Sequence, residues 1–270
     1  MALALRPTRV FRIKDVLALV GSEAITFLFH VGGVVQLWAA STRVIFTSRW
    51  DREAIVRQLF LIGNRSMGIV ALIALFTGMV LALQFMVSLA RFGLKLYTGQ
   101  VVGLSLTREL GPVLTSLMVS ARVGSGIAAE LGSMMVTEQV LAIEAMGANP
   151  LQRLVAPRVI ATMIATPLLT VLADAIGIFG GLVISMGDSA ITPTYYLRQV
   201  WQTVALSDFT HGLAKTVFFA GIVAYIACYE GLTTYGGTEG VGRSTTRAVV
   251  YASILIFITD FFLTKLFIVL

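Results

Sequence analysis

Residues 66–90 read SMGIVALIALFTGMVLALQFMVSLA and contain no aspartate, glutamate, lysine or arginine. An α-helix rises ~1.5 Å per residue, so about 20 residues cross the roughly 30 Å hydrocarbon core of a bilayer. The stretch is therefore long enough to span a membrane as a helix. A helix suits this environment because it satisfies its own backbone hydrogen bonds, which lipid cannot do.

Apolar stretches of similar length recur along the rest of the chain. They cover residues 99–128, 154–186, 207–230 and 247–270. Hydrophobic residues make up 57% of the sequence and charged residues only 13%, a composition far from that of a soluble domain. We predict an all-α polytopic membrane protein with five transmembrane helices.

The N-terminal part of the chain is less regular than these runs. Residues 16–47 are apolar but are interrupted by Glu23, His30 and Arg43, and several basic residues precede them. An amphipathic segment with basic flanks is typical of a helix that lies in the membrane interface. We predict an N-terminal interfacial elbow helix here, and a sixth span is the alternative.

No linker, low-complexity segment or internal repeat divides the sequence. One domain that spans residues 1–270 is therefore the simplest description. Within it, we expect an elbow region at residues 1–65 and a five-helix transmembrane bundle at residues 66–270.

The 20 lysine and arginine residues are distributed unevenly between the two sides of such a bundle. One side holds Arg6, Arg9, Arg12, Lys14, Arg43, Arg49, Arg52, Arg57, Arg65, Arg153, Arg158, Arg243 and Arg247, and the other holds Arg91, Lys95 and Arg198. Because cytoplasmic loops carry the positive excess, the N-terminus is predicted to be cytoplasmic and the C-terminus periplasmic. A basic face that contacts anionic lipid accounts for the net charge of +6, so no nucleic acid is needed to explain it.

A short amphipathic segment at residues 138–146 separates the second and third apolar runs on the predicted cytoplasmic side. Thr137 is suited to an N-cap and Gly147 to the C′ position, so residues 137–150 are predicted to hold a self-contained short helix. At ~1.5 Å per residue this helix is about 13 Å long and cannot cross a bilayer. It carries Glu138, Val140, Leu141, Ile143, Glu144 and Met146. That mixture suits a helix that docks in a groove on a partner protein, and an ordinary surface helix is the alternative.

Charged residues inside the apolar runs are the first candidates for function, because each costs roughly 2.5 to 3.5 kcal/mol at a helix centre on insertion scales. Arg108 and Glu109 lie in the second run, Lys215 in the fourth and Asp260 in the fifth. Their depths all approach the middle of the membrane, so we expect an ion-pair cluster. Such a cluster either contacts the substrate or locks the bundle together. Asp174, in the third run, is a further candidate for it.

Small residues recur at every fourth position between Ala121 and Ser133, which lets helix backbones approach closely. One such face consists of Gly124, Ala128 and Gly132, and a second of Ala121, Ser125, Ala129 and Ser133. Gly99 and Gly103 form a similar pair, as do Gly177 and Gly181. Each of these faces serves either packing within the chain or a dimer contact.

Signatures of enzyme chemistry are missing from the sequence. Its two histidines, His30 and His211, have no partner at metal-ligand spacing, and no GxxxxGK[ST] phosphate loop occurs. Any ATP that drives this protein must therefore be bound by another chain. Two other functions stay open: a proton- or ion-coupled secondary transporter of an amphipathic substrate, with Glu109, Asp260 and Lys215 as its relay, and a membrane enzyme with Glu109 as acid or base.

Four ordered blocks carry a family resemblance: LTRELGPV at 106–113, ARVGSGIAAELG at 121–132, TEQ at 137–139 leading to EAMG at 144–147 and NP at 149–150, and GRSTTRAVV at 242–250. Together they resemble the MlaE-type permeases of phospholipid-transporting ABC systems in double-membraned bacteria. The resemblance implies a homodimeric permease in the bacterial inner membrane, bound to two copies of a cytoplasmic ABC ATPase. That ATPase would bind ATP and Mg, and this chain would hold no cofactor or metal. A periplasmic ring of MCE-type lipid-binding proteins is also implied. The resemblance allows, in addition, a small accessory cytoplasmic subunit.

The same resemblance assigns roles to particular residues. A phospholipid translocation cavity would be lined by Leu81, Gln84, Phe85, Ser88, Leu89, Arg108, Glu109, Lys215 and Asp260. The short helix becomes a coupling helix, with ATPase contacts at Glu138, Gln139, Leu141, Glu144 and Met146. Core packing is the alternative role for Leu81 and Phe85. The function implied is the movement of phospholipids between inner and outer membranes, through ATP-driven closure of that cavity.

Overall fold

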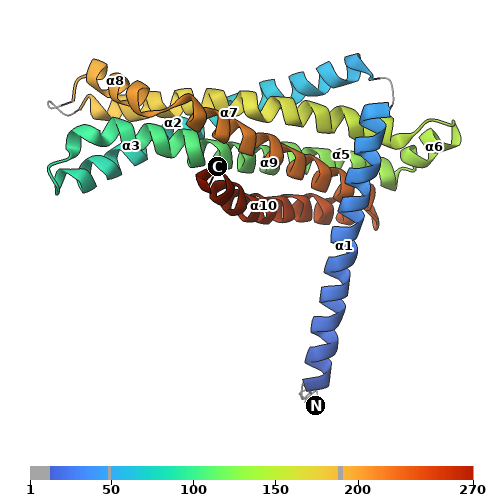
Figure 1. The fold of residues 1–270 in the computed structure, drawn as a ribbon. Helices are drawn as coiled ribbons and strands as arrows, with labels where there is room; N and C mark the ends of the chain where they lie inside the picture. The colour runs from blue at the N-terminus through green and yellow to red at the C-terminus, as the bar shows by residue number, and fades with distance from the viewer. Residues whose placement is uncertain (1–12, 48–49, 188–190, 270) are drawn as a thin grey trace, which may run out of the picture.

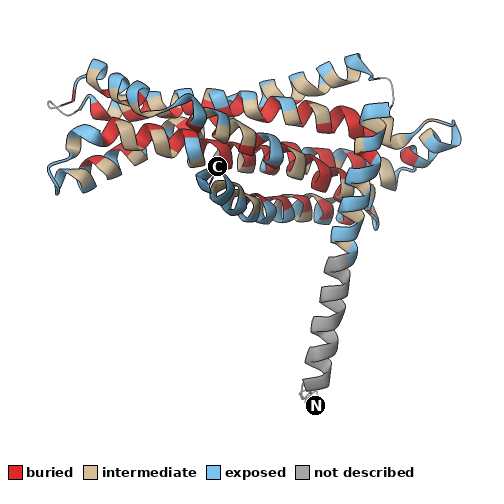
Figure 2. Ribbon diagram, viewed as in Figure 1, coloured by how far each residue is buried: buried red, intermediate tan, exposed pale blue. Residues whose placement is uncertain are grey.

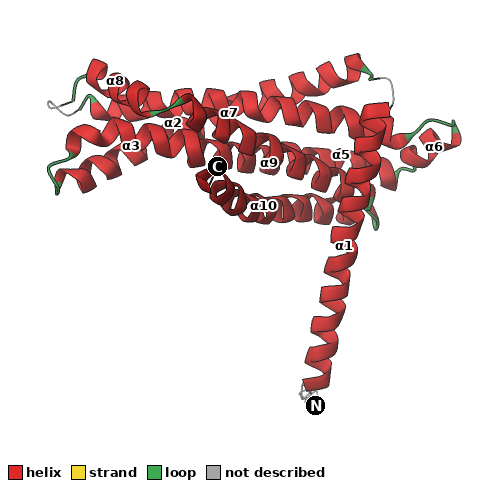
Figure 3. Ribbon diagram, viewed as in Figure 1, coloured by secondary structure: helices red, strands yellow, loops and turns green. Residues whose placement is uncertain are grey.

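The computed structural model describes residues 13–47, 50–187 and 191–269, with side chains from residue 29 onward. Every regular element in these ranges is helical (Figures 1 and 3), so the all-α prediction is confirmed. The α-helices are α1 (Ile13–Thr47), α2 (Arg52–Ala90), α3 (Thr98–Ser105), α4 (Gly111–Val119), α5 (Ser125–Val136), α6 (Gln139–Ala145), α7 (Ala156–Ser185), α8 (Pro193–Thr203), α9 (Leu206–Leu232) and α10 (Gly237–Val269). A 3₁₀ turn, η1 (Lys95–Tyr97), and three π-helical turns, η2 (Leu106–Leu110), η3 (Ser120–Gly124) and η4 (Leu151–Val155), join some of them.

Five helical segments are long and apolar enough to cross a membrane, as predicted. They are Arg52–Ala90, Lys95–Val136, Leu151–Ser185, Leu206–Leu232 and Gly237–Val269. The first of them starts well before its apolar run, because the carboxylate of Asp51 caps it by accepting from the N–H of Ala54 at 3.1 Å. The boundary expected between residues 65 and 66 therefore falls inside α2.

The second span runs without a break through α3, η2, α4, η3 and α5. Its first π-helical turn comes just before Pro112, which has no N–H and whose ring would collide with the carbonyl one turn earlier in a regular helix. In this wider turn the N–H of Gly111 donates to the carbonyl of Leu106, five residues back. The π-helical turn thus accommodates the proline, and the span continues as α4 after it.

Helices α2 and α7 pack through glycine. A Cβ on Gly78 would meet the backbone carbonyl of Gly177, and a Cβ on Gly180 would meet the carbonyl of Leu75. The buried residues of α2 fall at every fourth position, so one narrow stripe of this helix faces the bundle. The other residues of α2 are half-buried or exposed, which Figure 2 shows as tan and pale blue segments of the ribbon. The two helices therefore pack by close backbone contact at small residues, and not by interlocking large side chains.

The two small faces of the second span have different roles. Gly124 lies against Val223, and Gly132 lies against Thr234, so the face that includes both packs within the chain against α9 and the turn after it. The other face, represented by Ala121, is turned outward and remains a candidate for a dimer contact. The glycine pairs at 99 and 103 and at 177 and 181 are also used within the chain: Gly99, Gly103 and Gly181 lie against α8, and Gly177 lies against α2 and Leu106.

Helix α1 crosses the direction of the five spans near one end of the bundle (Figure 1). The part of α1 whose side chains are described contacts α7 and α9, and Thr42 and Tyr225 share a hydrogen bond of 3.2 Å between their hydroxyls. A direction across the spans is the orientation that an elbow helix requires, whereas a sixth span would run alongside the others.

Helices α6 and α8 mark opposite ends of the molecule (Figure 1). The short helix α6 begins after Glu138, which has the left-handed φ of 59°, so the prediction of Thr137 as its N-cap is wrong. Thr137 instead ends α5, where its hydroxyl donates to the carbonyl of Ser133 at 2.8 Å. Gly147, with φ of 76°, follows α6 as the predicted C′ residue.

Candidate functional site

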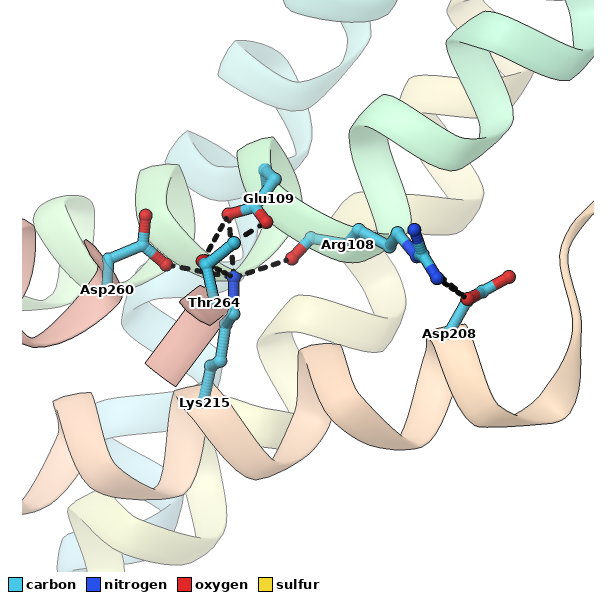
Figure 4. A network of polar contacts seen from close by, with 6 residues as sticks. All are labelled: Arg108, Glu109, Asp208, Lys215, Asp260 and Thr264. Atoms are coloured by element: carbon cyan, nitrogen blue, oxygen red, sulfur yellow. Dashed lines mark hydrogen bonds and ion pairs between the residues drawn. The ribbon is translucent and has the colours of Figure 1, made fainter. Parts of the chain in front are cut away.

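Lys215 lies at the centre of a polar network inside the bundle (Figure 4). It extends from α9, and only 2% of the residue is exposed. Its ammonium nitrogen Nζ donates to Oε2 of Glu109 and to Oγ1 of Thr264, both at 2.6 Å, and lies 3.0 Å from Oδ1 of Asp260. Thr264 in turn donates to Oε1 of Glu109 at 3.2 Å. The buried cation thereby joins α9 to η2 and α10.

Arg108 contributes its backbone carbonyl to this network. In a regular helix that carbonyl would accept from the N–H of residue 112, but residue 112 is a proline and has none. The ammonium of Lys215 donates to the carbonyl instead, at 3.2 Å. Pro112 thus exposes an acceptor in the middle of a span, and Lys215 satisfies it.

The Arg108 side chain points away from Lys215 and pairs with Asp208 on α9 (Figure 4). Its Nε and Nη2 both lie 2.7 Å from Oδ1 of Asp208, whose Oδ2 accepts from the N–H of Ala205 at 3.0 Å. The expectation that Arg108 joins the other three charges in one cluster is therefore wrong for its side chain. Successive residues on a helix point about 100° apart, so Arg108 and Glu109 face different neighbours.

The accessible surface of the network is acidic. The Glu109 side chain is 40% exposed and that of Asp260 19%, whereas the Lys215 side chain is 3% exposed. Two carboxylates therefore cover a single buried ammonium. This surface can accept hydrogen bonds from a polar group above it, and the cation beneath keeps the two acids together.

Asp208 and Thr264 take part in these contacts, but neither was singled out from the sequence. Asp208 stands three residues into α9, where an acid commonly caps a helix, and that position was the available signal. Asp174 was expected as a further member of the cluster, but no hydrogen bond or ion pair joins it to Lys215. It lies instead against Gly111, on another side of the second span.

The first-span residues expected to line a cavity fall into two groups. Gln84 and Ser88 are exposed, and Leu81, Phe85 and Leu89 are half-buried. Leu81 and Phe85 pack against a small buried cluster between α2 and α3, so at least part of their role is packing within the chain. The two exposed members are polar and stand four residues apart, so they share one face of α2.

The short helix α6 presents one face outward and holds the other inside. Leu141 is 57% exposed and Met146 76%, and the predicted contact residues Glu138, Gln139 and Glu144 are also exposed. Val140 is buried, and Ile143 packs against the main core. These two apolar residues therefore fix the helix to its own bundle and are not available to a partner.

Further ion pairs lie toward the α6 end of the bundle. Arg158, counted as a loop residue from the sequence, is buried in α7, and its Nη2 lies 2.9 Å from a carboxylate oxygen of Glu130. Glu230, at the end of α9, is approached by Arg247 at 3.1 Å and by His30 at 3.6 Å. No group of three His, Cys, Asp or Glu residues within the described ranges is placed to hold a metal ion.

The sequence of this chain is similar to those of known permease proteins. The family model described as Permease MlaE matches residues 55–266. A probable ABC transporter permease protein of Rickettsia typhi is 41% identical over 254 residues, which cover 94% of this chain and 98% of the relative. The intermembrane phospholipid transport system permease protein MlaE of Haemophilus influenzae is 40% identical over 213 residues, 78% of this chain and 82% of the relative. A chloroplastic protein of Arabidopsis thaliana, TRIGALACTOSYLDIACYLGLYCEROL 1, is 38% identical over 212 residues, 78% of this chain and 61% of the relative.

Proposed function

The chain belongs to the MlaE family of permeases, and from that membership we propose that it is the permease subunit of an ABC transporter that moves phospholipids between inner and outer membranes. The permease itself supplies the path through the membrane. Two copies of a cytoplasmic ATPase bind ATP and Mg and supply the energy. Two permease chains enclose the lipid path, and a periplasmic ring of MCE-type proteins receives or delivers the lipid.

The observation that carries this proposal is the outward face of α6. A helix of seven residues is too short to span a membrane, and it stands at one end of the bundle with Leu141 and Met146 exposed. Large exposed apolar side chains on a fixed short helix favour docking with another protein. A cytoplasmic ATPase is the partner that an ABC permease needs at this place.

Movement of α6 can reach the polar network through one continuous helix. Helix α6 contacts α5, and the second span runs from α5 through α4 to η2, which carries Glu109. A push on α6 therefore acts along a continuous helical span that carries part of the Lys215 network. In this proposal, ATP-driven closure of the ATPases shifts that element and narrows the lipid path.

Apolar walls along this path keep the lipid tails out of water. Exposure of each CH₂ to water costs ~0.8 kcal/mol, so a two-chain lipid that leaves the bilayer stays against apolar walls without a deep head-group pocket. Exposed Gln84 and Ser88 on α2 offer hydrogen bonds to a head group, as do the partly exposed carboxylates of Glu109 and Asp260. Closure of the walls would then expel the lipid.

The proposal is tested by purification of the tagged chain from its native membranes in mild detergent, followed by mass spectrometry of what accompanies it. We expect a soluble ABC ATPase at one copy per permease chain, together with phospholipid. A permease that purifies without any ATPase, in a detergent that preserves known ABC complexes, would refute the assignment.

A further inference from the structure

A cavity lies away from the Lys215 network, between α7, α8 and the start of α9. Its volume is about 610 Å³, and its walls include Val171, Ile178, Val200 and Phe209. Trp201, which is 88% exposed, stands at its edge. The cavity is therefore apolar, large enough for part of a lipid, and open at the α8 end of the bundle.

One acid, Asp174, projects into this apolar setting. The residue is 4% exposed, and its Oδ1 has no hydrogen-bond partner among the described residues. That oxygen occupies the space that a Cβ on Gly111 would need, so the absence of a side chain at residue 111 makes room for it. Oδ1 is enclosed against Gly111, so a ligand in the cavity would donate to the other carboxylate oxygen, Oδ2, which also has no hydrogen bond among the described residues. A buried carboxylate without a partner costs free energy, and such a donor lowers that cost.

No basic residue is found among the described residues that line the cavity. The nearest cation along the chain is Arg108, which follows the lining residue Thr107 and pairs with Asp208 beside the lining residues Ala205 and Phe209. An acid inside the cavity and a half-exposed guanidinium at its rim are complementary to a head group with an inner ammonium and an outer phosphate. An anionic head group without an amine, such as that of phosphatidylglycerol, would offer Asp174 only neutral hydroxyl donors, which form weaker hydrogen bonds with a carboxylate than an ammonium does.

We propose that this cavity binds the head group of a phospholipid that carries a primary ammonium, as phosphatidylethanolamine does, with the ammonium donating to Asp174. The proposal rests on the proposed function in that the ligand is a phospholipid. Asp174 lies eleven residues before the end of α7, so at ~1.5 Å per residue it is about 16 Å from that end. The apolar walls between Asp174 and the mouth would contact the glycerol and upper acyl carbons.

The test uses the full chain with its co-purified ATPase and a photoreactive amino acid at position 201. The complex is incubated with equal amounts of phosphatidylethanolamine, phosphatidylcholine and phosphatidylglycerol of identical acyl chains, and the crosslinked lipid is identified. We expect phosphatidylethanolamine to be crosslinked about tenfold more than either other lipid, because a charge-assisted hydrogen bond is worth that order of discrimination. The choline head group is cationic but has no N–H to donate, so it separates hydrogen bonding from charge.

Three variants localise the effect. Asp174→Asn should abolish the preference, and Ala175→Phe, which fills the cavity from an exposed lining position, should abolish crosslinking of all three lipids. Asp51→Asn makes the same chemical change at an exposed N-cap, where asparagine caps equally well, and should behave as the wild type.

Equal crosslinking of the three lipids in the wild type, or a preference that persists in Asp174→Asn, would overturn the inference. The total phospholipid that co-purifies with the wild type is measured separately. Retained phospholipid without an amine preference at position 201 defeats this inference alone. A complex that retains no phospholipid defeats the proposed function and this inference together.

Discussion

Lys215 is the residue on which the network depends, because it is the only cation that contacts Glu109 and Asp260 in the described part of the chain. Removing one partner of a buried ion pair leaves the other charges uncompensated, which commonly costs about 3–5 kcal/mol. The partial exposure of Glu109 moves the expected loss toward the lower end of that range. We therefore predict that Lys215→Met lowers the melting temperature of the purified protein.

Lys265→Met serves as the matched control, because Lys265 is an exposed lysine one residue from Thr264 in the same helix. Its melting temperature should stay close to that of the wild type, measured by scanning fluorimetry in the same detergent. A second variant, Lys215→Met with Asp260→Asn, removes a stranded acid and should recover part of the loss. Equal melting temperatures for Lys215→Met and Lys265→Met would show that the network does not hold the bundle.

At the scale of residues, the sequence could predict which charges matter but not where each one points. Depth along a span follows from residue number, so Glu109, Lys215 and Asp260 could be placed at one level. The direction of Arg108 depends on the π-helical turn before Pro112 and on an unexpected partner, Asp208. The π-helical turn and the pairing with Asp208 depend on contacts between helices, which cannot be derived from the spacing of residues in the sequence.

At the scale of elements, the contact between α2 and α7 depends on residues without side chains. Gly78→Ala would place a Cβ on the carbonyl of Gly177, so the helices would have to separate. Overpacking of this kind costs typically 1–3 kcal/mol. We predict a lower melting temperature and a lower yield of folded protein for Gly78→Ala.

Gly68→Ala is the matched control for that prediction. Gly68 lies on the same helix, and a Cβ there meets nothing within 4 Å. It should change the melting temperature little. If the two alanine variants behave alike, close packing of α2 on α7 is not what stabilises this pair.

Helix α6 gives the second prediction at this scale. Met146→Asp adds a charge to an exposed apolar position and leaves Val140 and Ile143 in the core, so the permease should fold normally. Loss of an apolar contact at the docking face should reduce the ATPase that co-purifies with the chain about tenfold. Met186→Asp, at a residue that is 57% exposed at the opposite end of the bundle, should leave co-purification unchanged. Full ATPase recovery with Met146→Asp would argue against α6 as the docking element.

The elements themselves were predictable because apolar run length and composition decide which segments cross a membrane. Their ends were less predictable. Helix α2 starts far ahead of its apolar run because a capped helix continues through arginines, and α6 starts one residue late because Glu138 takes a left-handed conformation. A non-glycine residue seldom adopts that conformation, so capping preference alone pointed to Thr137.

At the scale of the whole molecule, orientation follows from the distribution of basic residues and can be measured with single cysteines. The native Cys228 is fully buried, so it contributes little background. Thr194→Cys, at the exposed start of α8, should react with an impermeant maleimide in cells whose outer membrane is permeable. Ala145→Cys in α6 and Ala40→Cys in α1 should react only after the inner membrane is opened.

The reverse labelling pattern would show that the chain has the opposite orientation in the membrane. Labelling of Ala40→Cys under neither condition would favour a sixth span over an elbow helix. The sequence could not choose between these arrangements, nor between lipid-facing and partner-facing surfaces. The spans are apolar on most sides, and a helix of that kind does not reveal which face meets lipid and which meets another helix.

The most direct measurement of the central claim is phospholipid transfer by the purified permease and its ATPase in proteoliposomes. A fluorescent phospholipid is followed from these vesicles to acceptor vesicles, with ATP, without ATP, and with an imposed proton gradient. The account predicts transfer that requires ATP and the ATPase, is lost in Met146→Asp, and does not respond to the gradient. Transfer by the permease alone, driven by the proton gradient, would contradict the account and identify a secondary transporter.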